Sequence, residues 1–375
     1  MSAPRLLHVF PAFGTGGPEV RTALLINAMP EFSHGILSLN GDESGKARLD
    51  APQSVAVTVL PAAAGLAARL KALARALEAS RPDGVISYGW GGTDAILAAR
   101  LARLPRPLHI EDGFLPDEAR QQKFARLQVR RLAFRAAAGV IVPSRTLERI
   151  ATREWWLPAR HVRFFPNGID TARFAPGSPD TVARARIAIG AAAEELVVGT
   201  VAALRPDKNH SRLLRAFATL TAALPARLVI VGDGPCRSAL DAEARLLGVS
   251  ERVAFTGAAI DPSAFYHAMD VFALSSDTEQ MPLSVLEAMA SGLPVVSTDV
   301  GDVADMVEPP QGGLVVARDE SALATALSRL GADAGERRKM GGANRARAVA
   351  VYSLTEMIER YRSAFRGLLK APAVA

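Results

Sequence analysis

Short apolar runs alternate with helical periodicity along the first half of the chain. Apolar runs bounded by Gly, Pro or polar residues are typical of buried strands, whereas apolar spacings of three and four are typical of helices. The pattern predicts strands at residues 5–10, 55–60, 84–87, 108–110 and 140–142. It predicts helices at residues 19–29, 66–79 and 93–103, the last with Thr93 as its N-cap. This alternation favours βαβ units around a parallel sheet.

A second alternation begins at Leu196. It predicts strands at residues 197–201, 228–231, 253–255, 271–273 and 294–297, with helices between them. A stretch rich in turn residues, 165–179, separates the two halves, and residues 354–369 form a last helix with no strand after it. We therefore expect an α/β protein with Rossmann-like domains at 1–173 and 174–352, facing each other across a cleft. Residues 353–375 would pack back on the first domain.

Length and composition agree with two soluble domains. The chain has 375 residues, of which 49% are hydrophobic and 22% charged. No apolar run approaches the roughly 18 residues of a spanning helix, and residues 1–11 lack the features of a secretion signal. The single cysteine, Cys236, excludes an internal disulfide, so a cytoplasmic location is expected.

The net charge of +6 fits an anionic substrate or membrane surface, although an Arg-rich composition alone would also produce it. The sequence has no zinc-ligand spacing and no RNA-recognition signature. Nucleic acid is therefore not an expected partner.

The most specific pattern lies at residues 279–292, where two acids flank the start of a predicted helix. Pro282 suits the first helical turn and Gly292 suits the stop. Glu279 would precede the helix and Glu287 would lie within it, so their carboxylates could contact different parts of one ligand. Carboxylates accept hydrogen bonds from vicinal hydroxyls, so one could hold a hexose and the other a ribose. The alternative is a solvated acidic pair on a surface helix.

A second pattern follows the strand predicted at 197–201. The loop after it carries Arg205 and Lys208, and two cations three residues apart at a strand's carboxyl end suit a diphosphate. They would stabilise the charge on a departing nucleoside diphosphate. An ordinary pair of surface cations is the alternative.

Two glycine-rich turns also follow predicted strands. Gly14-Thr15-Gly16-Gly17 precedes a helix, where backbone amides could approach a phosphate. A dinucleotide fingerprint would need glycine where Glu19 stands, which weakens an NAD-binding interpretation. The second turn, 231–235, contains Gly232 and would shape a nucleotide pocket.

With these motifs and Pro166-Asn167-Gly168-Ile169-Asp170, the chain resembles the retaining glycosyltransferases of the GT-B fold, family 4. The resemblance covers nearly the whole chain. It implies transfer of a sugar from a UDP- or GDP-sugar with retention at the anomeric carbon, without a metal because basic residues take its place. It implies that the catalytic residues are Arg205, Lys208, Asp112 and Glu279. It implies that the donor-binding residues are Gly16, Gly17, Arg205, Lys208, Gly232, Glu279, Gln280, Met281, Pro282, Leu283 and Glu287.

The first domain departs from the family at residues 107–114. Many members carry a histidine near the donor sugar, and Asp112 occupies that position here, while His109 lies inside the preceding strand. Asp112 could orient the acceptor or stabilise positive charge on the donor sugar. Glu111 is the competing candidate for an acceptor contact, and His109 is expected to be a buried strand residue.

Residues 118–135 combine basic and apolar side chains in a stretch that could be an amphipathic helix on an anionic membrane surface. The alternative is a helix packed on its own sheet with a solvated basic face. The basic residues are Arg120, Lys123, Arg126, Arg130, Arg131 and Arg135.

These observations favour an enzyme that glycosylates a glycan or lipid-linked acceptor in cell-surface polysaccharide biosynthesis. The expected mechanism is front-face attack by an acceptor hydroxyl, whose proton passes to the departing phosphate. A non-catalytic nucleotide-sugar-binding protein on the same fold remains an alternative, and an NAD-dependent oxidoreductase is a further one.

Overall fold

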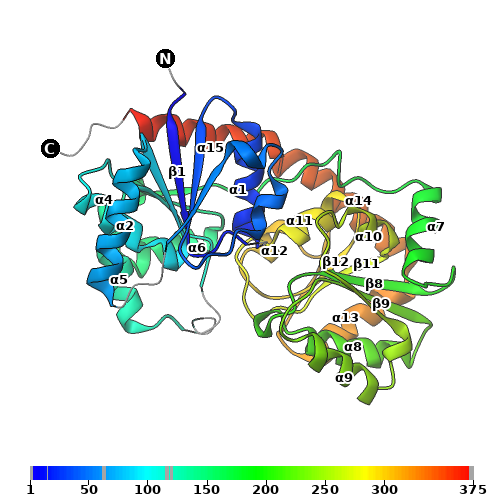
Figure 1. Ribbon diagram of the computed structural model, residues 1–375. Coiled ribbons are helices and arrows are strands. Elements are labelled where there is room, and N and C mark those ends of the chain that lie inside the picture. The colour runs from blue at the N-terminus through cyan, green and yellow to red at the C-terminus, as the bar shows by residue number, and fades with distance from the viewer. Residues whose placement is uncertain (1–2, 15, 61–64, 115–117, 119–120, 371–375) are drawn as a thin grey trace. The chain divides into compact units, whose positions relative to one another are not determined.

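The computed structural model describes residues 3–14, 16–60, 65–114, 118 and 121–370. It divides into two compact units (Figure 1). Unit 1 comprises residues 1–166 and 355–375, and unit 2 comprises residues 167–354. The first passage from one unit to the other falls inside the turn-rich stretch at 165–179. Among the described residues, no helix is both long and apolar enough to cross a membrane.

The described residues of unit 1 form a seven-stranded parallel sheet in the order β3-β2-β1-β4-β5-β6-β7. The strands are β1 (Arg5–Phe10), β2 (Ser33–Ser38), β3 (Ala56–Val59), β4 (Gly84–Tyr88), β5 (Leu108–Ile110), β6 (Gly139–Val142) and β7 (Val162–Phe164). The helices are α1 (Gly17–Ala28), α2 (Leu66–Ser80), α3 (Gly89–Gly92), α4 (Asp94–Leu101), α5 (Phe124–Ala136), α6 (Arg145–Arg153) and α15 (Leu354–Leu369).

Helices cover both faces of this sheet because successive strand residues point to opposite sides. In β1, Leu7 and Val9 belong to the core that contains residues of α2 and α4. His8 points the other way, with its ring 6.0 Å from that of Phe365 in α15. Helix α15 also holds α1, since Arg362 donates to the carbonyl of Ala28. The last helix therefore completes the fold of unit 1.

The described residues of unit 2 form a six-stranded parallel sheet in the order β10-β9-β8-β11-β12-β13. The strands are β8 (Leu196–Val201), β9 (Ala226–Val231), β10 (Val253–Gly257), β11 (Val271–Leu274), β12 (Val295–Thr298) and β13 (Gly313–Val316). The helices are α7 (Pro179–Ala188), α8 (His210–Thr221), α9 (Arg237–Leu246), α10 (Ser263–Ala268), α11 (Leu283–Ala290), α12 (Val303–Val307), α13 (Glu320–Ala332) and α14 (Ala334–Val351).

The structure confirms two Rossmann-like sheets, and it corrects several local predictions. Strands β2, β7 and β13 were missed because each is short or interrupted by polar residues, and only pairing with a neighbour identifies them. Thr93 occupies the N-cap position of α4, as predicted, but it does not act as a cap. It has helical backbone angles and its side chain makes no capping bond, because the short helix α3 runs directly into α4.

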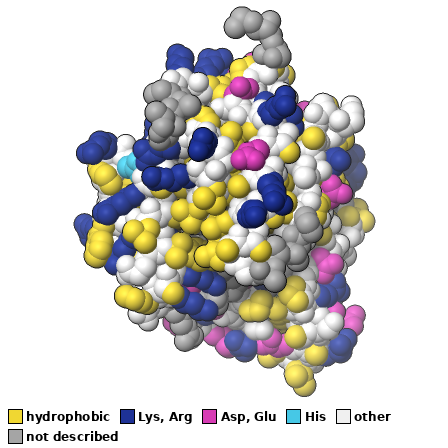
Figure 2. Space-filling view, turned by 60° about the vertical axis from the view of Figure 1, so that its left-hand side comes forward, with side chains coloured by type: hydrophobic (Ala, Val, Ile, Leu, Met, Phe, Trp, Pro, Cys, Tyr) yellow, Lys and Arg dark blue, Asp and Glu magenta, His cyan; other side chains and the backbone are white. Residues whose placement is uncertain are grey.

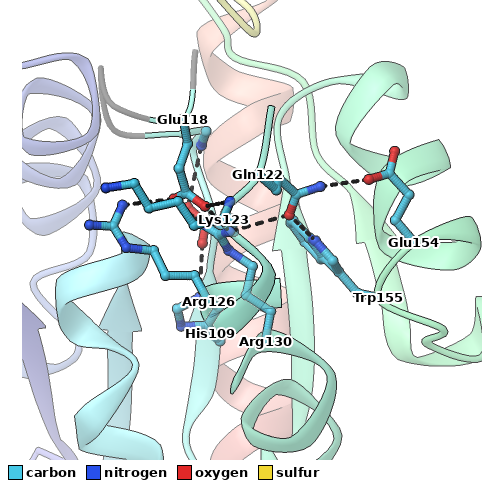
Figure 3. A network of polar contacts seen from close by, with 10 residues as sticks. His109, Glu118, Gln122, Lys123, Arg126, Arg130, Glu154 and Trp155 are labelled. Atoms are coloured by element: carbon cyan, nitrogen blue, oxygen red, sulfur yellow. Dashed lines mark hydrogen bonds and ion pairs between the residues drawn. The ribbon is translucent and has the colours of Figure 1, made fainter. Parts of the chain in front are cut away.

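Helix α5 is tied to unit 1 by a buried polar network around Glu118 (Figure 3). Both carboxylate oxygens of Glu118 accept from Arg130, at 2.9 and 2.8 Å, and Arg126 donates a further bond. Arg130 also donates to Gln122, which accepts from the indole of Trp155. This pairing explains why the helix begins at Phe124 and not at residue 118 as predicted: Glu118 precedes the helix and folds onto its buried face.

Replacing Glu118 with glutamine should lower the free energy of unfolding of unit 1 by about 3–5 kcal/mol, because Arg130 would stay buried without its carboxylate. All three tryptophans, Trp90, Trp155 and Trp156, lie in unit 1, so urea unfolding followed by tryptophan fluorescence reports on this unit. Glu148→Gln is the control, since it breaks an exposed ion pair with Arg145. Equal losses in the two variants would contradict a special role for Glu118.

The same variant should change the acid sensitivity of unit 1. Burial opposes ionisation of Glu118, but bonds from Arg130, Arg126 and the Lys123 amide outweigh it and lower the pKa to about 2. Its stabilisation is therefore complete above the ordinary pKa of 4.5 and is lost as the pH falls towards about 2. The difference between Glu118→Gln and wild type should shrink over this range.

Candidate functional site

The strand order in each sheet places a ligand crevice at a defined point. In unit 2, β8 pairs with β11, but the chain after β8 continues to β9 on one side of it and the chain after β11 continues to β12 on the other. The loops that follow β8 and β11 therefore run in opposite directions. Ligands of open α/β sheets bind at such a switch point, outside the carboxyl ends of the strands. The loop after β8 carries Arg205 and Lys208, and the loop after β11 carries Glu279. The fold thus brings the cations and the first acid to one edge of unit 2.

Lys208 and Glu279 form a direct ion pair there. Lys208 Nζ lies 2.6 Å from Glu279 Oε1, and the side chains are only 16% and 11% exposed. Ser276 Oγ donates to the same oxygen at 2.8 Å. Both bonds use Oε1, so Oε2 is open to a ligand hydroxyl as far as the described residues show. An ammonium has three donors, so Lys208 can bind an anion while it keeps Glu279.

Arg205 lies on the same loop and is half exposed. Its Nε and Nη2 donate to the two carboxylate oxygens of Asp207. Asp207 is buried and also lies 4.0 Å from Lys208 Nζ. Asp207 was not predicted, although its position between the two cations was a signal. This carboxylate holds Arg205 and Lys208 on the same short turn.

Gly232 has a role that only glycine can fill. Its φ is 151°, and a Cβ there would lie 1.9 Å from the carbonyl oxygen of Ala202. The close approach lets Leu204 donate its amide to the Asp233 carbonyl at 2.9 Å. The turn after β9 therefore packs directly on the loop that carries Arg205.

Glu287 lies in α11, where the hydroxyl of Tyr266 donates to its Oε2 at 2.6 Å. Burial and the Glu287 carboxylate raise the pKa of Tyr266 well above its ordinary value, so the phenol remains a donor. Gly292 follows the helix with φ of 76°, as predicted, but Pro282 is the N-cap and not a residue of the first turn. Sequence alone contained no sign of Tyr266, which lies on another helix.

The loop before α11, which contains Gln280, Met281 and Pro282 and leads to Leu283, is held from two sides. The side-chain amide of Asn167 donates to the Met281 carbonyl at 2.8 Å. On the other side the Asp302 amide donates to the Gln280 carbonyl at 2.8 Å. The Pro-Asn-Gly-Ile-Asp motif thus positions the predicted donor loop through Asn167.

In unit 1 the glycine turn follows β1, next to the switch point between β1 and β4. Gly16 is the N-cap of α1 and Gly17 its first residue, while Thr15 lies outside the described residues. Glu19 folds back over Gly16, since a Cβ on that glycine would meet its Oε2 at 2.6 Å. Burial, together with the Asp112 and Asp42 carboxylates, raises the pKa of Glu19 to about 7, against the opposing effects of its backbone hydrogen bond and the positive charge of Arg21.

Asp112 is held by a buried arginine. Arg21 donates to both of its carboxylate oxygens, at 2.6 and 2.8 Å, and is 1% exposed. The Asp112 carboxylate therefore has a fixed counter-charge, and both of its oxygens already accept hydrogen bonds. The sequence analysis did not identify Arg21, whose one available signal is its position among apolar residues of α1.

Glu111 and His109 are both buried in unit 1. His109 Nδ1 bonds to Ser87 Oγ at 2.9 Å, and its ring stacks on Phe134, so it is the buried strand residue that was expected. Its Nε2 lies 3.7 Å from Glu111 Oε2, and among the described residues neither atom has a hydrogen-bond partner. Glu111 thus faces the strand histidine.

The stretch at 118–135 presents a different surface from the one predicted. Arg126 and Arg130 turn inward to Glu118, and Arg120 lies outside the described residues. The outward face of α5 instead exposes Phe124 and Leu132, at 76% and 74%. Figure 2 shows hydrophobic side chains interspersed with Lys and Arg over one face of the molecule.

Among the described residues, no three His, Cys, Asp or Glu side chains lie close enough together to hold a metal ion. In the part of the chain that the structure describes, the cation in direct contact with Glu279 is Lys208.

Comparison with known families covers both units. Residues 16–168 match the family described as Glycosyl transferase 4-like domain, and residues 195–333 match Glycosyl transferases group 1. A GDP-mannose-dependent alpha-(1-6)-phosphatidylinositol monomannoside mannosyltransferase from Mycobacterium tuberculosis (strain ATCC 25618 / H37Rv) is 32% identical over 74% of this chain and 75% of the relative. The protein of the same description from Mycolicibacterium smegmatis is 36% identical over 59% of this chain, which spans 60% of that relative's length.

Solved structures resemble the chain along almost its whole length. Anabaena HepE in complex with UDP and glucose matches with a TM-score of 0.85 and 21% identity, over 97% of this chain and 100% of that one. Sucrose-phosphate synthase from Thermosynechococcus elongatus matches with a TM-score of 0.82 and 22% identity, over 98% of this chain and 100% of that one. At these identities the likeness establishes the fold.

Glu19→Gln should make the protein more stable at neutral and alkaline pH. Because the pKa of Glu19 is raised in the folded protein, its protonated side chain contributes fully to the free energy of unfolding below the ordinary pKa of 4.5. This contribution is lost as the pH rises through about 7. Glutamine carries no charge and avoids that loss. The variant should therefore have the same Tm as wild type below about pH 4.5, and a higher Tm above pH 7, where its free energy of unfolding is larger by roughly 1–3 kcal/mol. Glu43→Gln, which removes an exposed carboxylate, is the control. A pH-independent difference would contradict the assignment.

Proposed function

Because the chain has the GT-B fold and belongs to the group 1 glycosyltransferases of family GT4, we propose that it is a retaining enzyme using a GDP- or UDP-sugar. It transfers the sugar to a hydroxyl of a glycan or lipid-linked acceptor in cell-surface polysaccharide biosynthesis. GDP-mannose is the first donor to test, because several relatives at 32–37% identity are named as GDP-mannose-dependent.

The observation that carries this proposal is the Lys208–Glu279 pair beside Arg205 at the switch point of unit 2. Lys208 and Arg205 bind the diphosphate and stabilise its negative charge as it departs. Glu279 accepts hydrogen bonds from the donor sugar through Oε2. Glu287, already bonded to Tyr266, accepts from the ribose hydroxyls.

The remaining predicted residues are assigned by their place in each unit. Gly232 keeps the turn after β9 close to the diphosphate loop, and residues 280–283 offer backbone groups to the donor. Gly16 and Gly17 lie at the start of α1, where their backbone amides are proposed to bind a phosphate. Asp112, with Glu111 behind it, contacts the acceptor or the developing positive charge on the donor sugar.

The proposed mechanism is front-face attack by the acceptor hydroxyl. The acceptor oxygen forms a bond to the anomeric carbon while the bond to the diphosphate oxygen breaks on the same face. The proton of the hydroxyl passes to the departing phosphate, so no protein base is required. Two fixed cations supply the charge stabilisation, and the reaction proceeds without a metal ion.

The membrane is the proposed location of the acceptor. The exposed Phe124 and Leu132 of α5, with Lys123 and Arg135 near its two ends, suit the interface of an anionic bilayer. The relatives whose acceptors are phosphatidylinositol mannosides give independent support.

The reaction can be tested on the purified protein. We expect GDP-mannose to raise Tm more than UDP- or ADP-sugars, and slow hydrolysis of the stabilising donor to occur without acceptor and in the presence of EDTA. Glucose-1-phosphate and NAD are the controls. Donor binding without any hydrolysis or transfer would indicate a non-catalytic sugar-nucleotide-binding protein. Loss of turnover on chelation would contradict the metal-free mechanism.

Two variants should separate binding from turnover. Arg205→Ala should lower kcat roughly 100-fold with a smaller effect on donor affinity, because its charge acts mainly on the departing diphosphate. Glu287→Ala should weaken donor binding about 10-fold, because it removes a charged hydrogen bond to the ribose. Arg215→Ala, on the outer surface of α8, is the matched control. Unchanged kinetics in both site variants would refute the assignment.

A further inference from the structure

A cavity lies in unit 1, away from the residues of the proposed active site. Its volume is about 770 Å³, and Arg106, Arg135, Arg160 and His161 are among the residues that line it. Arg106 precedes β5 and His161 precedes β7, so the cavity opens at the amino ends of these strands. In a parallel sheet this edge is opposite the carboxyl ends, where the glycine turn and Asp112 lie. The cavity therefore needs its own explanation.

The lining of this cavity is cationic. Arg106 donates from Nε and Nη2 to the carbonyls of Ala136 and Arg135, and Arg135 donates to the carbonyl of Trp156. Arg160 is exposed on a single 3₁₀ turn. In the described part of the chain, no Asp or Glu lines the cavity or pairs with these three arginines. Guanidinium groups gathered without carboxylates match a phosphate, which they can bind through several parallel donors.

Apolar side chains in and next to the cavity favour a lipid as the source of that phosphate. Trp156 is 55% exposed although its φ is 55°, in the left-handed region that a bulky side chain rarely adopts. The Arg131 guanidinium lies 3.4 Å from its ring centroid. Leu132, one turn before Arg135, is 74% exposed. An aromatic ring and an aliphatic side chain beside cations are typical of side chains at a bilayer interface, and a free phosphate would leave the exposed apolar surface of both in water.

We propose that this cavity binds the phosphate group of an anionic phospholipid, while Trp156 and Leu132 contact the surrounding lipid. The inference rests on the membrane contact proposed for α5 and adds a specific headgroup site to it. Helix α5 has 13 residues, which corresponds to about 20 Å. Helix α5 runs from the carboxyl ends of the strands, where Asp112 lies, to the cavity at their amino ends. A bound headgroup would therefore hold the end of α5 that is farther from Asp112.

Arg160→Glu is the most direct test, because Arg160 has no ion pair among the described residues and its replacement should not affect folding. Binding is measured by flotation with phosphatidylcholine vesicles, with and without phosphatidylglycerol. We expect wild type to bind the anionic vesicles and Arg160→Glu to bind roughly 30-fold more weakly, since a cation near the surface is replaced by an anion. Arg366→Glu, an identical charge change on α15, is the control and should bind like wild type.

The outcomes separate the headgroup site from the membrane contact and from the transferase reaction. Wild type that floats with neither vesicle overturns both the site and the membrane contact, whereas equal flotation of wild type and Arg160→Glu overturns the site alone. Displacement from vesicles by inorganic phosphate, against a sulfate control at equal ionic strength, would show a free-phosphate site and overturn the lipid assignment. Leu132→Asp should also weaken flotation, and unchanged donor hydrolysis in Arg160→Glu shows that the reaction is intact.

Discussion

The partly buried ion pair between Lys208 and Glu279 is the interaction on which the rest of the candidate site depends. It joins the loops after two neighbouring strands, β8 and β11, at the switch point of unit 2. A charged group that is largely shielded from water is unfavourable without a partner of opposite charge. Movement of either loop would therefore cost free energy, because it would leave Lys208 or Glu279 unpaired. The pair therefore sets the spacing between the groups proposed to bind the diphosphate and the sugar.

The same physical rule governs the charged groups of unit 1. Arg21 neutralises Asp112 through two short bonds, and Arg130 neutralises Glu118 beneath α5. These pairs remove four side chains from the set of freely available charges and leave others exposed at the surface. The cationic cavity differs because, in the described region, its arginines have no carboxylate partners, and two of them, Arg106 and Arg135, donate to backbone carbonyls. Electrostatic pairing thus decides which cations of a basic chain are available to a ligand.

Family membership and the site support different parts of the functional argument. The relatives establish a glycosyltransferase of group 1, and the solved structures establish the fold. Folds of this kind support many donors and acceptors, so specificity has to come from individual side chains. Tyr266 is an example, because its hydroxyl orients Glu287 from a different helix.

The sequence by itself determined the two sheets, the last helix at 354–369, and the loops that carry Arg205, Lys208 and Glu279. These depend on local periodicity and on glycine or proline at turns, which a linear pattern contains. Strands β2, β7 and β13 were not predictable in this way, since pairing with a distant neighbour defines them. Only the tertiary structure decided that Arg21 and Glu118 neutralise nearby charges, and that part of the basic stretch at 118–135 points inward. Such contacts join residues far apart in the chain, and burial makes them obligatory only after the sheets have formed.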